Sequence, residues 1–224
     1  MLIDQFNRKI NYIRVSVTDR CDFRCVYCMS EKMTFIPKND LMSLEEIARV
    51  VRIFNGLGVE KVRITGGEPL VRRNIDWLFK TINKENHLKE LTLTTNGSQL
   101  KHKASMLKDS GVERINISLD SLDPDTFMRM TRIGKLNEVL EGIQHAKKIG
   151  FKKIKLNVVL MKNLNGHEVF NLVDFAIDSG FDISFIEEMP LGGTQFNRNE
   201  TSVSNDDILN SLQNNYKLSK SNFA

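Results

Sequence analysis

Only three cysteines occur in the 224 residues, and all of them fall between Cys21 and Cys28. Secreted proteins that rely on disulfides distribute their cysteines along the chain, so that bridges can join distant segments. No cysteine is left here for a long-range bridge. The sequence therefore excludes a disulfide scaffold, and the three neighbouring thiols need another explanation.

Long apolar runs and blocks of like charge are also missing. No stretch approaches the roughly 18 apolar residues that a membrane span requires. Asp4 and Arg8 interrupt the region where a signal peptide would be apolar. The net charge of +4 and the pI near 8.9 are too weakly basic to indicate nucleic-acid binding. We therefore expect a soluble, cytoplasmic protein without a membrane or nucleic-acid partner.

Short apolar segments alternate with amphipathic segments along the chain. The apolar segments are rich in Ile, Val, Leu and Thr, which predicts strands, and the segments between them have helical periodicity. Ser43-Leu44-Glu45-Glu46 reads as a capping box at one helix start. The expected strands are 13–18, 61–65, 90–95, 114–119, 152–160 and 182–187, and the expected helices are 43–57, 74–84, 101–110, 124–130, 137–149, 168–179 and 204–216.

Each expected strand has an aliphatic face and a polar face. If the aliphatic faces meet the helices, a set of polar side chains points into a lumen: Arg14, Arg63, Thr94, Ser118, Lys155 and Asn157. A sheet with its polar face in water explains any single strand equally well. Parallel sheets are usually covered on both faces, however, and buried cations need partners, which favours a wet pocket for an anion. We therefore expect an α/β fold, an open and incomplete (β/α)6 TIM-type barrel, rather than a doubly wound sheet.

The cysteine run directly follows the first expected strand. Thiolates this close together bind zinc, bind iron or form a redox pair. A structural zinc site needs four ligands, and a redox pair of Cys25 and Cys28 leaves Cys21 unexplained. Three cysteines on a [4Fe–4S] cluster leave one iron open to a small ligand. The spacing favours an iron–sulfur cluster and leaves zinc and redox chemistry open.

The cysteine run, with Tyr27 beside its last cysteine, resembles the radical S-adenosylmethionine (SAM) superfamily. The run Thr65-Gly66-Gly67-Glu68-Pro69 after the second expected strand carries the same resemblance. Within the superfamily the sequence resembles the GTP 3′,8-cyclases of molybdenum cofactor biosynthesis. The blocks that carry this likeness are 14–21, 62–73, 93–97, 114–120, 155–159 and 185–189.

The resemblance implies a radical SAM lyase. A 5′-deoxyadenosyl radical from SAM would take hydrogen from C3′ of GTP. The C3′ radical would then attack C8 of guanine, giving (8S)-3′,8-cyclo-7,8-dihydroguanosine 5′-triphosphate. No side chain is assigned as a general acid or base. The implied [4Fe–4S] ligands are Cys21, Cys25 and Cys28, the SAM contacts are Tyr27, Gly67, Ser118 and Met189, and the GTP contacts are Arg14, Arg63, Thr94 and Lys155. The implied partners are an electron donor and a downstream cyclic pyranopterin monophosphate synthase, and a homodimer is left open.

The sequence departs from this family in its cysteines. Family members continue further and carry three more cysteines, which bind a second [4Fe–4S] cluster that holds guanine. No cysteine follows Cys28 here, so the ligands of that second cluster are absent. We therefore expect residues 1–203 to form the radical SAM core domain and residues 204–224 to begin a truncated C-terminal region.

Other functions stay open as alternatives. A SAM-cleaving remnant and a radical SAM enzyme with another substrate, such as a peptide, are enzyme alternatives, although the lumen cations speak against a peptide. A zinc or nucleic-acid binding module is the non-enzyme alternative. We expect ordinary structural roles for Asp120 and Asp123, which organise a turn, and for Arg72 and Arg73, which lie in a solvated loop.

Overall fold

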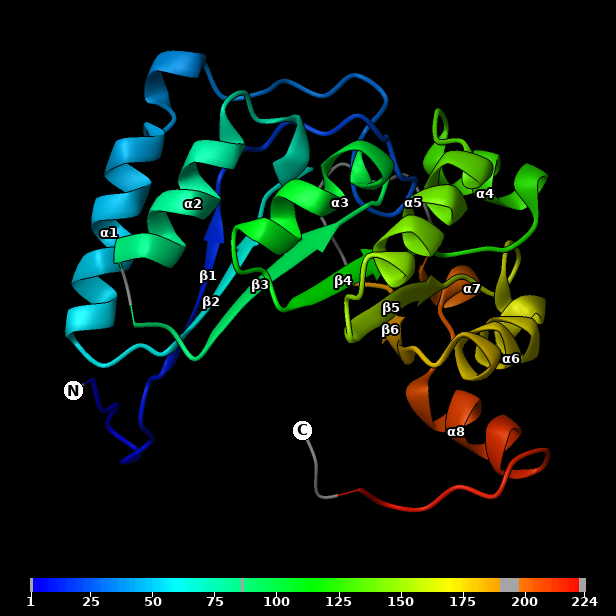
Figure 1. Ribbon diagram of the computed structural model, residues 1–224. Coiled ribbons are helices and arrows are strands. Elements are labelled where there is room, and N and C mark those ends of the chain that lie inside the picture. Colours follow the sequence, from blue (N-terminus) through cyan, green and yellow to red (C-terminus); the bar gives the residue numbers. More distant parts are fainter. Residues whose placement is uncertain (1, 86, 190–197, 222–224) are drawn as a thin grey trace.

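The fold is built on one sheet of six parallel strands. The computed structural model describes residues 2–85, 87–189 and 198–221. The strands follow one another in space in chain order, with the helices of the βα units packed along one face (Figure 1). Their bounds are β1 (Tyr12–Ser16), β2 (Lys61–Thr65), β3 (Glu90–Thr95), β4 (Arg114–Ser118), β5 (Lys153–Leu160) and β6 (Asp182–Glu187).

Every expected helix is present, with bounds within three residues of those predicted. The helices are α1 (Leu44–Gly56), α2 (Ile75–Glu85), α3 (Leu100–Asp109), α4 (Pro124–Thr131), α5 (Leu136–Lys148), α6 (Val169–Ser179) and α8 (Asn205–Gln213). The sequence did not indicate the short helix α7 (Arg198–Thr201) or the 3-10 turns η1 (Lys38–Asp40), η2 (Pro69–Val71) and η3 (Gly166–Glu168). In the described chain, no helix is both long enough and apolar enough to cross a membrane.

The strand order confirms the open barrel. A doubly wound sheet reverses its strand order at a switch point, whereas here β1 to β6 run without reversal. Among the described residues β1 pairs only with β2, and β6 only with β5, so the barrel does not close. The register aligns Arg14 with Arg63 and aligns Asn116 with both Thr94 and Lys155. Polar residues of different strands therefore share one face.

The aliphatic face of the sheet forms the core with the helices, as expected. Val62, Ile64, Leu93, Ile115 and Ile117 are fully buried in one continuous cluster with residues from α1, α2, α3 and α5. Helix α1 begins with the predicted capping box, in which the Ser43 hydroxyl accepts from Glu46 N at 3.1 Å and the Glu46 carboxylate accepts from Ser43 N at 2.7 Å. Burial on this side leaves the opposite, polar face free to line a site.

Candidate functional site

A pocket of about 430 Å³ lies where the carboxyl ends of β1 to β4 meet the cysteine loop, residues 19–29. In (β/α) barrels this end of the strands carries the active site. The pocket brings together most of the residues that the sequence singled out: Cys21, Cys25, Tyr27, Cys28, Gly67, Thr94 and Ser118. Its volume falls within the range of roughly 300–1,000 Å³ typical of small-molecule sites.

The cysteine loop is held in place by the end of helix α4. Arg24 N donates to Thr131 O at 3.0 Å, and Val26 N donates to Met130 O at 2.9 Å. The rings of Phe23 and Phe127 meet edge to face, with their centroids 6.0 Å apart. These contacts fix the backbone that carries the three thiols without using the thiols themselves.

Arg132 also holds the cysteine loop, through hydrogen bonds from its side chain. Its φ of 64° lies in the left-handed region, which a residue with a long side chain rarely adopts. The guanidinium Nη1 donates to Arg24 O at 2.9 Å and to Met29 O at 3.0 Å, on either side of Cys25 and Cys28. Strained backbone of this kind is typical of functional sites. Nothing in the local sequence around Arg132 indicates this role.

A polar network joins the loop to the end of β3. The Asp22 carboxylate accepts from Asn96 Nδ2 at 2.7 Å and from the Ser98 hydroxyl at 2.6 Å. Asn96 Nδ2 also lies 3.7 Å from Cys21 Sγ. Hydrogen bonds to a sulfur ligand are one means by which proteins adjust an iron–sulfur cluster. The network therefore both positions Cys21 and sets the polarity around its sulfur.

Tyr27 and Asp120 form a buried pair across the pocket. The Tyr27 hydroxyl donates to Asp120 Oδ2 at 2.6 Å, and Val159 N donates to Oδ1 at 2.8 Å. Burial, followed by the Asp120 charge, raises the pKa of Tyr27 well above its usual 10, so the hydroxyl stays protonated. Burial raises the pKa of Asp120 to about 6 against these hydrogen bonds. Asp120 is thus more than a turn residue, whereas Asp123 caps α4 as expected, accepting from Thr126 N at 2.8 Å.

The thiols lie in surroundings that disfavour an isolated thiolate. Burial is the main cause that raises the pKa of Cys21 to about 11 and raises the pKa values of Cys25 and Cys28. The Asp120 charge raises the last two further. Iron cations would compensate this accumulated negative charge and deprotonate the ligands. The donor set therefore fits a metal cluster.

The three cysteines lie around one pocket, which is compatible with a cluster. In the described part of the chain no three His, Cys, Asp or Glu side chains converge on a point that would hold a single metal ion. A [4Fe–4S] cluster does not require convergence, since each cysteine binds a different iron. Cys21, Cys25 and Cys28 nevertheless line one pocket.

The glycine turn after β2 packs against the backbone that leads into the cysteine loop. Gly67 N donates to Thr18 O at 2.7 Å, and Glu68 N donates to Arg20 O at 2.8 Å. A Cβ on Gly66 would lie 2.5 Å from Thr18 O, and one on Gly67 would lie 2.5 Å from Arg20 O. Only glycine permits these approaches, and both glycines line the pocket.

The Glu68 carboxylate is turned away from the pocket. Oε1 accepts from Leu70 N at 3.0 Å and from the Thr95 hydroxyl at 2.8 Å, and Oε2 accepts from Asn96 N at 2.6 Å. Burial raises the pKa of Glu68 to about 7, although these three donors favour the ionised form. Glu68 fastens the ends of β2 and β3 together, a role that the sequence motif does not reveal.

The polar face of the sheet continues below the pocket. Thr94 lines the pocket, while Arg14 and Arg63 lie at the middle of their strands and Lys155 lies in the first half of β5, all on the same face of the sheet. Thr94 Oγ1 and Arg63 Nε are buried atoms with no hydrogen-bond partner among the described residues. Buried polar groups without a partner are rare and mark a place for a ligand or water.

Met189 is a further predicted site residue that does not line the pocket, as Arg14, Arg63 and Lys155 do not. It follows β6 by two residues, and its side chain is 61% exposed. It does not line the pocket that holds the three cysteines. Its predicted contact with SAM stays a prediction.

Comparison with known proteins places this arrangement in a family. Residues 15–176 match the model of the radical SAM superfamily. The GTP 3′,8-cyclase of Saccharophagus degradans is 51% identical over 222 residues, covering 99% of this chain and 67% of that protein. The GTP 3′,8-cyclase of Pseudomonas entomophila is 52% identical over 221 residues, covering 98% of this chain and 66% of that protein. The chain thus spans about two thirds of the length of these relatives.

Solved structures share the fold at low sequence identity. Streptococcus suis SuiB bound to S-adenosylmethionine superposes with a TM-score of 0.71 at 19% identity, covering 92% of this chain and 48% of that one. Methylornithine synthase superposes with a TM-score of 0.68 at 14% identity, covering 92% of this chain and 62% of that one. The likeness to these structures supports the barrel, and the identity to the curated relatives goes further: the chain belongs to the radical SAM superfamily and, within it, to the GTP 3′,8-cyclase family.

Proposed function

We propose that this chain contributes the SAM-cleaving and triphosphate-binding parts of a GTP 3′,8-cyclase, which converts GTP to (8S)-3′,8-cyclo-7,8-dihydroguanosine 5′-triphosphate in the cytoplasm. The observation that carries the proposal is the pocket at the end of the sheet, where three cysteines, a glycine turn and the carboxyl ends of β1 to β4 meet. Beside it lies a sheet face with three cations.

The cysteine end of the pocket suits a [4Fe–4S] cluster with SAM. Together these cofactors supply a 5′-deoxyadenosyl radical by one-electron cleavage of SAM, and the protein positions and shields the reactants. Cys21, Cys25 and Cys28 would hold three irons. Gly67 would admit the SAM methionyl group, and Ser118 would bind SAM through its hydroxyl. Tyr27, fixed by Asp120, closes the same side of the pocket.

The sheet face suits the triphosphate of GTP. Arg14 and Arg63 are neighbours in the β1–β2 register, and Lys155 lies on β5 of the same face. Guanidinium and ammonium groups bind phosphate through charge-assisted hydrogen bonds. The unsatisfied Arg63 Nε and Thr94 Oγ1 would gain acceptors in the nucleotide. Occupation of this face would place the ribose toward the cysteines and exclude water from the reacting atoms.

The proposal covers the triphosphate and the ribose of GTP and leaves out the guanine base. The second [4Fe–4S] cluster of the family has no cysteine ligands in this sequence after Cys28. We therefore assign no guanine-binding residue in this chain. The downstream cyclic pyranopterin monophosphate synthase, the electron donor and a homodimer belong to the same proposal.

Anaerobic reconstitution with iron and sulfide tests the cofactor part. We expect a brown protein with about four irons per chain that cleaves SAM under a chemical reductant. The variant Cys25→Ala should lose the colour and the cleavage. A protein that binds one zinc per chain and takes up no iron would support the zinc alternative and overturn this proposal.

Calorimetric titration with GTP tests the nucleotide part. Arg63→Ala should weaken GTP binding about tenfold or more, because a charge-assisted contact is removed. Arg52→Ala is the matched control, since Arg52 lies on α1 and its side chain is 59% exposed. Equal GTP affinity in the wild type and the Arg63→Ala variant would contradict the assignment of GTP to the sheet face.

A further inference from the structure

Arg63 lies at the middle of β2, on the polar face of the sheet. In the described part of the chain no carboxylate forms an ion pair with its guanidinium. Its Nε is a buried atom without a hydrogen-bond partner among the same residues. A cation in such a place needs other groups to hold it, because a partly buried charge without compensation is costly.

The ring of Tyr12 is one group that holds this guanidinium. Tyr12 lies on β1, where its register partner is Lys61, two residues before Arg63 on β2. Side chains in such a diagonal position on neighbouring strands can reach one another when they are aromatic or long. Arg63 Cζ lies 5.5 Å from the ring centroid, a distance at which the face of the ring attracts a cation. The ring therefore stabilises the charge of Arg63 without neutralising it.

Asn116 on β4 approaches the same guanidinium. It is 3% exposed and lies on the polar face, where the register aligns it with Thr94 and Lys155. With the amide oxygen toward Arg63, Oδ1 accepts from Nη1 and from Nη2, each at 3.3 Å. The reverse orientation would set amide N–H donors against guanidinium donors, which cannot bond. Arg63 thus reaches from β2 across β3 to a neutral acceptor on β4.

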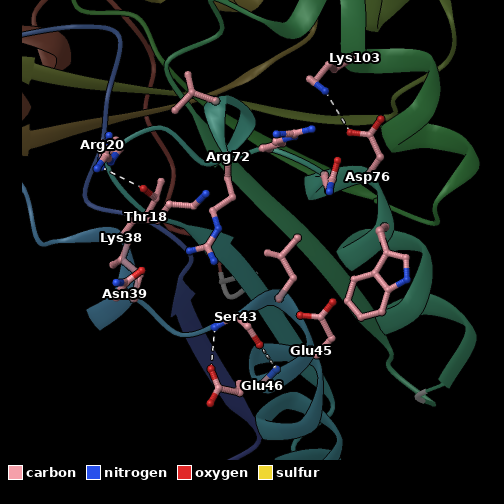
Figure 2. A pocket seen from close by; sticks show the side chains of 16 residues that line it. Thr18, Arg20, Lys38, Asn39, Ser43, Glu45, Glu46, Arg72, Asp76 and Lys103 are labelled. Carbon is pink, nitrogen blue, oxygen red and sulfur yellow. Dashed lines mark hydrogen bonds and ion pairs between the residues drawn. The ribbon is translucent and has the colours of Figure 1, made fainter.

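Arg72 shows the contrasting case of an arginine whose donors are taken by the backbone. It lines a second hollow of about 1110 Å³, between the turn before α1 and the start of α2 (Figure 2). Its Nη1 donates to Val17 O and its Nη2 donates to Met42 O. The solvated loop expected at Arg72 is therefore wrong for this residue. Arg63 differs because its Nε still has no acceptor.

We propose that Asn116 is a positioning residue for GTP, which holds the Arg63 guanidinium over β3, on the side of Thr94 and Lys155, where a phosphate group can bind. This inference rests on the proposed function, since it presupposes that the sheet face binds the triphosphate. A neutral amide suits the role, because a carboxylate would neutralise Arg63 and repel phosphate oxygens. A long side chain that is held before the ligand arrives also loses less entropy on binding.

The variant Asn116→Asp separates positioning from a merely structural role. A carboxylate has nearly the shape of the amide and would form an ion pair with Arg63, so we expect the variant to keep its melting temperature. We expect its dissociation constant for GTP, measured by calorimetric titration, to rise about tenfold or more. Asn137→Asp makes the same change on the exposed surface of α5 and should alter the constant less than about twofold. Unchanged GTP affinity in Asn116→Asp would overturn the proposal.

A double-mutant cycle tests whether Asn116 acts through Arg63. Asn116→Ala, Arg63→Ala and the double variant are each titrated with GTP. We expect Asn116→Ala to weaken binding, and the double variant to bind GTP as weakly as Arg63→Ala alone, because the group to be positioned is already gone. Additive losses would mean that Asn116 acts independently of Arg63, and they would overturn the positioning role.

Iron loading and GTP binding of the wild type separate this inference from the proposed function. We expect both Asn116 variants to take up as much iron as the wild type on anaerobic reconstitution. If the wild type binds no GTP, the proposed function fails. If the wild type binds GTP and Arg63→Ala weakens the binding while Asn116→Asp does not, the positioning proposal alone fails. Loss of iron loading in the Asn116 variants would mean that they disturb the whole pocket, and it would contradict the assignment.

Discussion

At the scale of single residues, the side chains that shape the pocket act through partners far away in the sequence. Glu68 holds Thr95 and Asn96, Asp120 holds Tyr27, and Arg132 holds the cysteine loop. The sequence predicted the thiols and the glycine turn because their spacing is local. It predicted none of these supporting contacts, because the position of a carboxylate in a sequence motif does not determine which hydrogen-bond donors its side chain meets in the fold.

Glu68→Gln tests the role of the buried carboxylate. An amide nitrogen cannot accept, so at least one of the three donors around Glu68 loses its partner. We expect the free energy of unfolding to fall by about 1–3 kcal/mol, measured by urea denaturation at neutral pH. Glu45→Gln, on the exposed surface of α1, is the control and should change stability by less than about 0.5 kcal/mol.

The pH dependence of the same variant has a definite sign. The pKa of Glu68 is about 7 in the folded protein and near 4.5 when exposed, so between these values the folded state holds more protons. The free energy of unfolding contributed by Glu68 therefore falls as pH rises through this window, by up to about 1.4 kcal/mol per unit. Glu68→Gln should flatten this slope, and an unchanged slope would contradict the assignment.

At the scale of elements, alternation and capping predicted nearly everything. The aliphatic residues of β2, β3 and β4 are buried, and the polar residues face the pocket side, as period-two patterning requires. The capping box and the Asp123 cap fixed two helix starts. The path of the cysteine loop was not predictable, because it depends on hydrogen bonds to α4 rather than on a repeat within the loop.

Gly67→Ala tests the contact between the β2 turn and the β1 turn. The added Cβ would meet Arg20 O and Asp19 O, so the backbone must move apart. We expect a loss of about 1–3 kcal/mol in unfolding free energy and a weaker SAM affinity by equilibrium dialysis. Gly56→Ala is the matched control: it adds the same methyl in open space at the end of α1, where alanine is the better helix former. Equal stability of the two variants would contradict the steric argument.

At the scale of the whole molecule, the open barrel was predictable, but the groove that Trp77 lines between the turn before α1 and the start of α2 was not. Six similar βα units and a polar strand face indicated the barrel. The groove depends on how the turn before α1 folds over the start of α2, and Lys38 and Trp77 belong to no common motif. Its surface emerges only when the elements are assembled.

Cluster loading should stabilise the whole domain. The cysteine loop is bonded to α4 and to the end of β3, so iron bound there joins segments that separate on unfolding. We expect the melting temperature to rise by about 5 °C or more on anaerobic reconstitution, measured by calorimetry. Cys25→Ala should melt at the same temperature with and without iron and sulfide. An equal rise in that variant would place the iron elsewhere.

The strand that carries Arg14 has a neighbour on one side only. In the described chain β1 pairs with β2 alone, so its other backbone edge is free to recruit a strand from another molecule. Tyr12, Arg14 and Ser16 are all exposed on this strand. A charge on an edge strand discourages such pairing, so we expect Arg14 to protect the protein from aggregation as well. Substitution of Arg14 by a β-branched residue would then lower solubility as well as remove a cation, and the two effects could not be separated. Arg14→Lys keeps the charge on the edge strand, so it tests the contribution of the guanidinium alone.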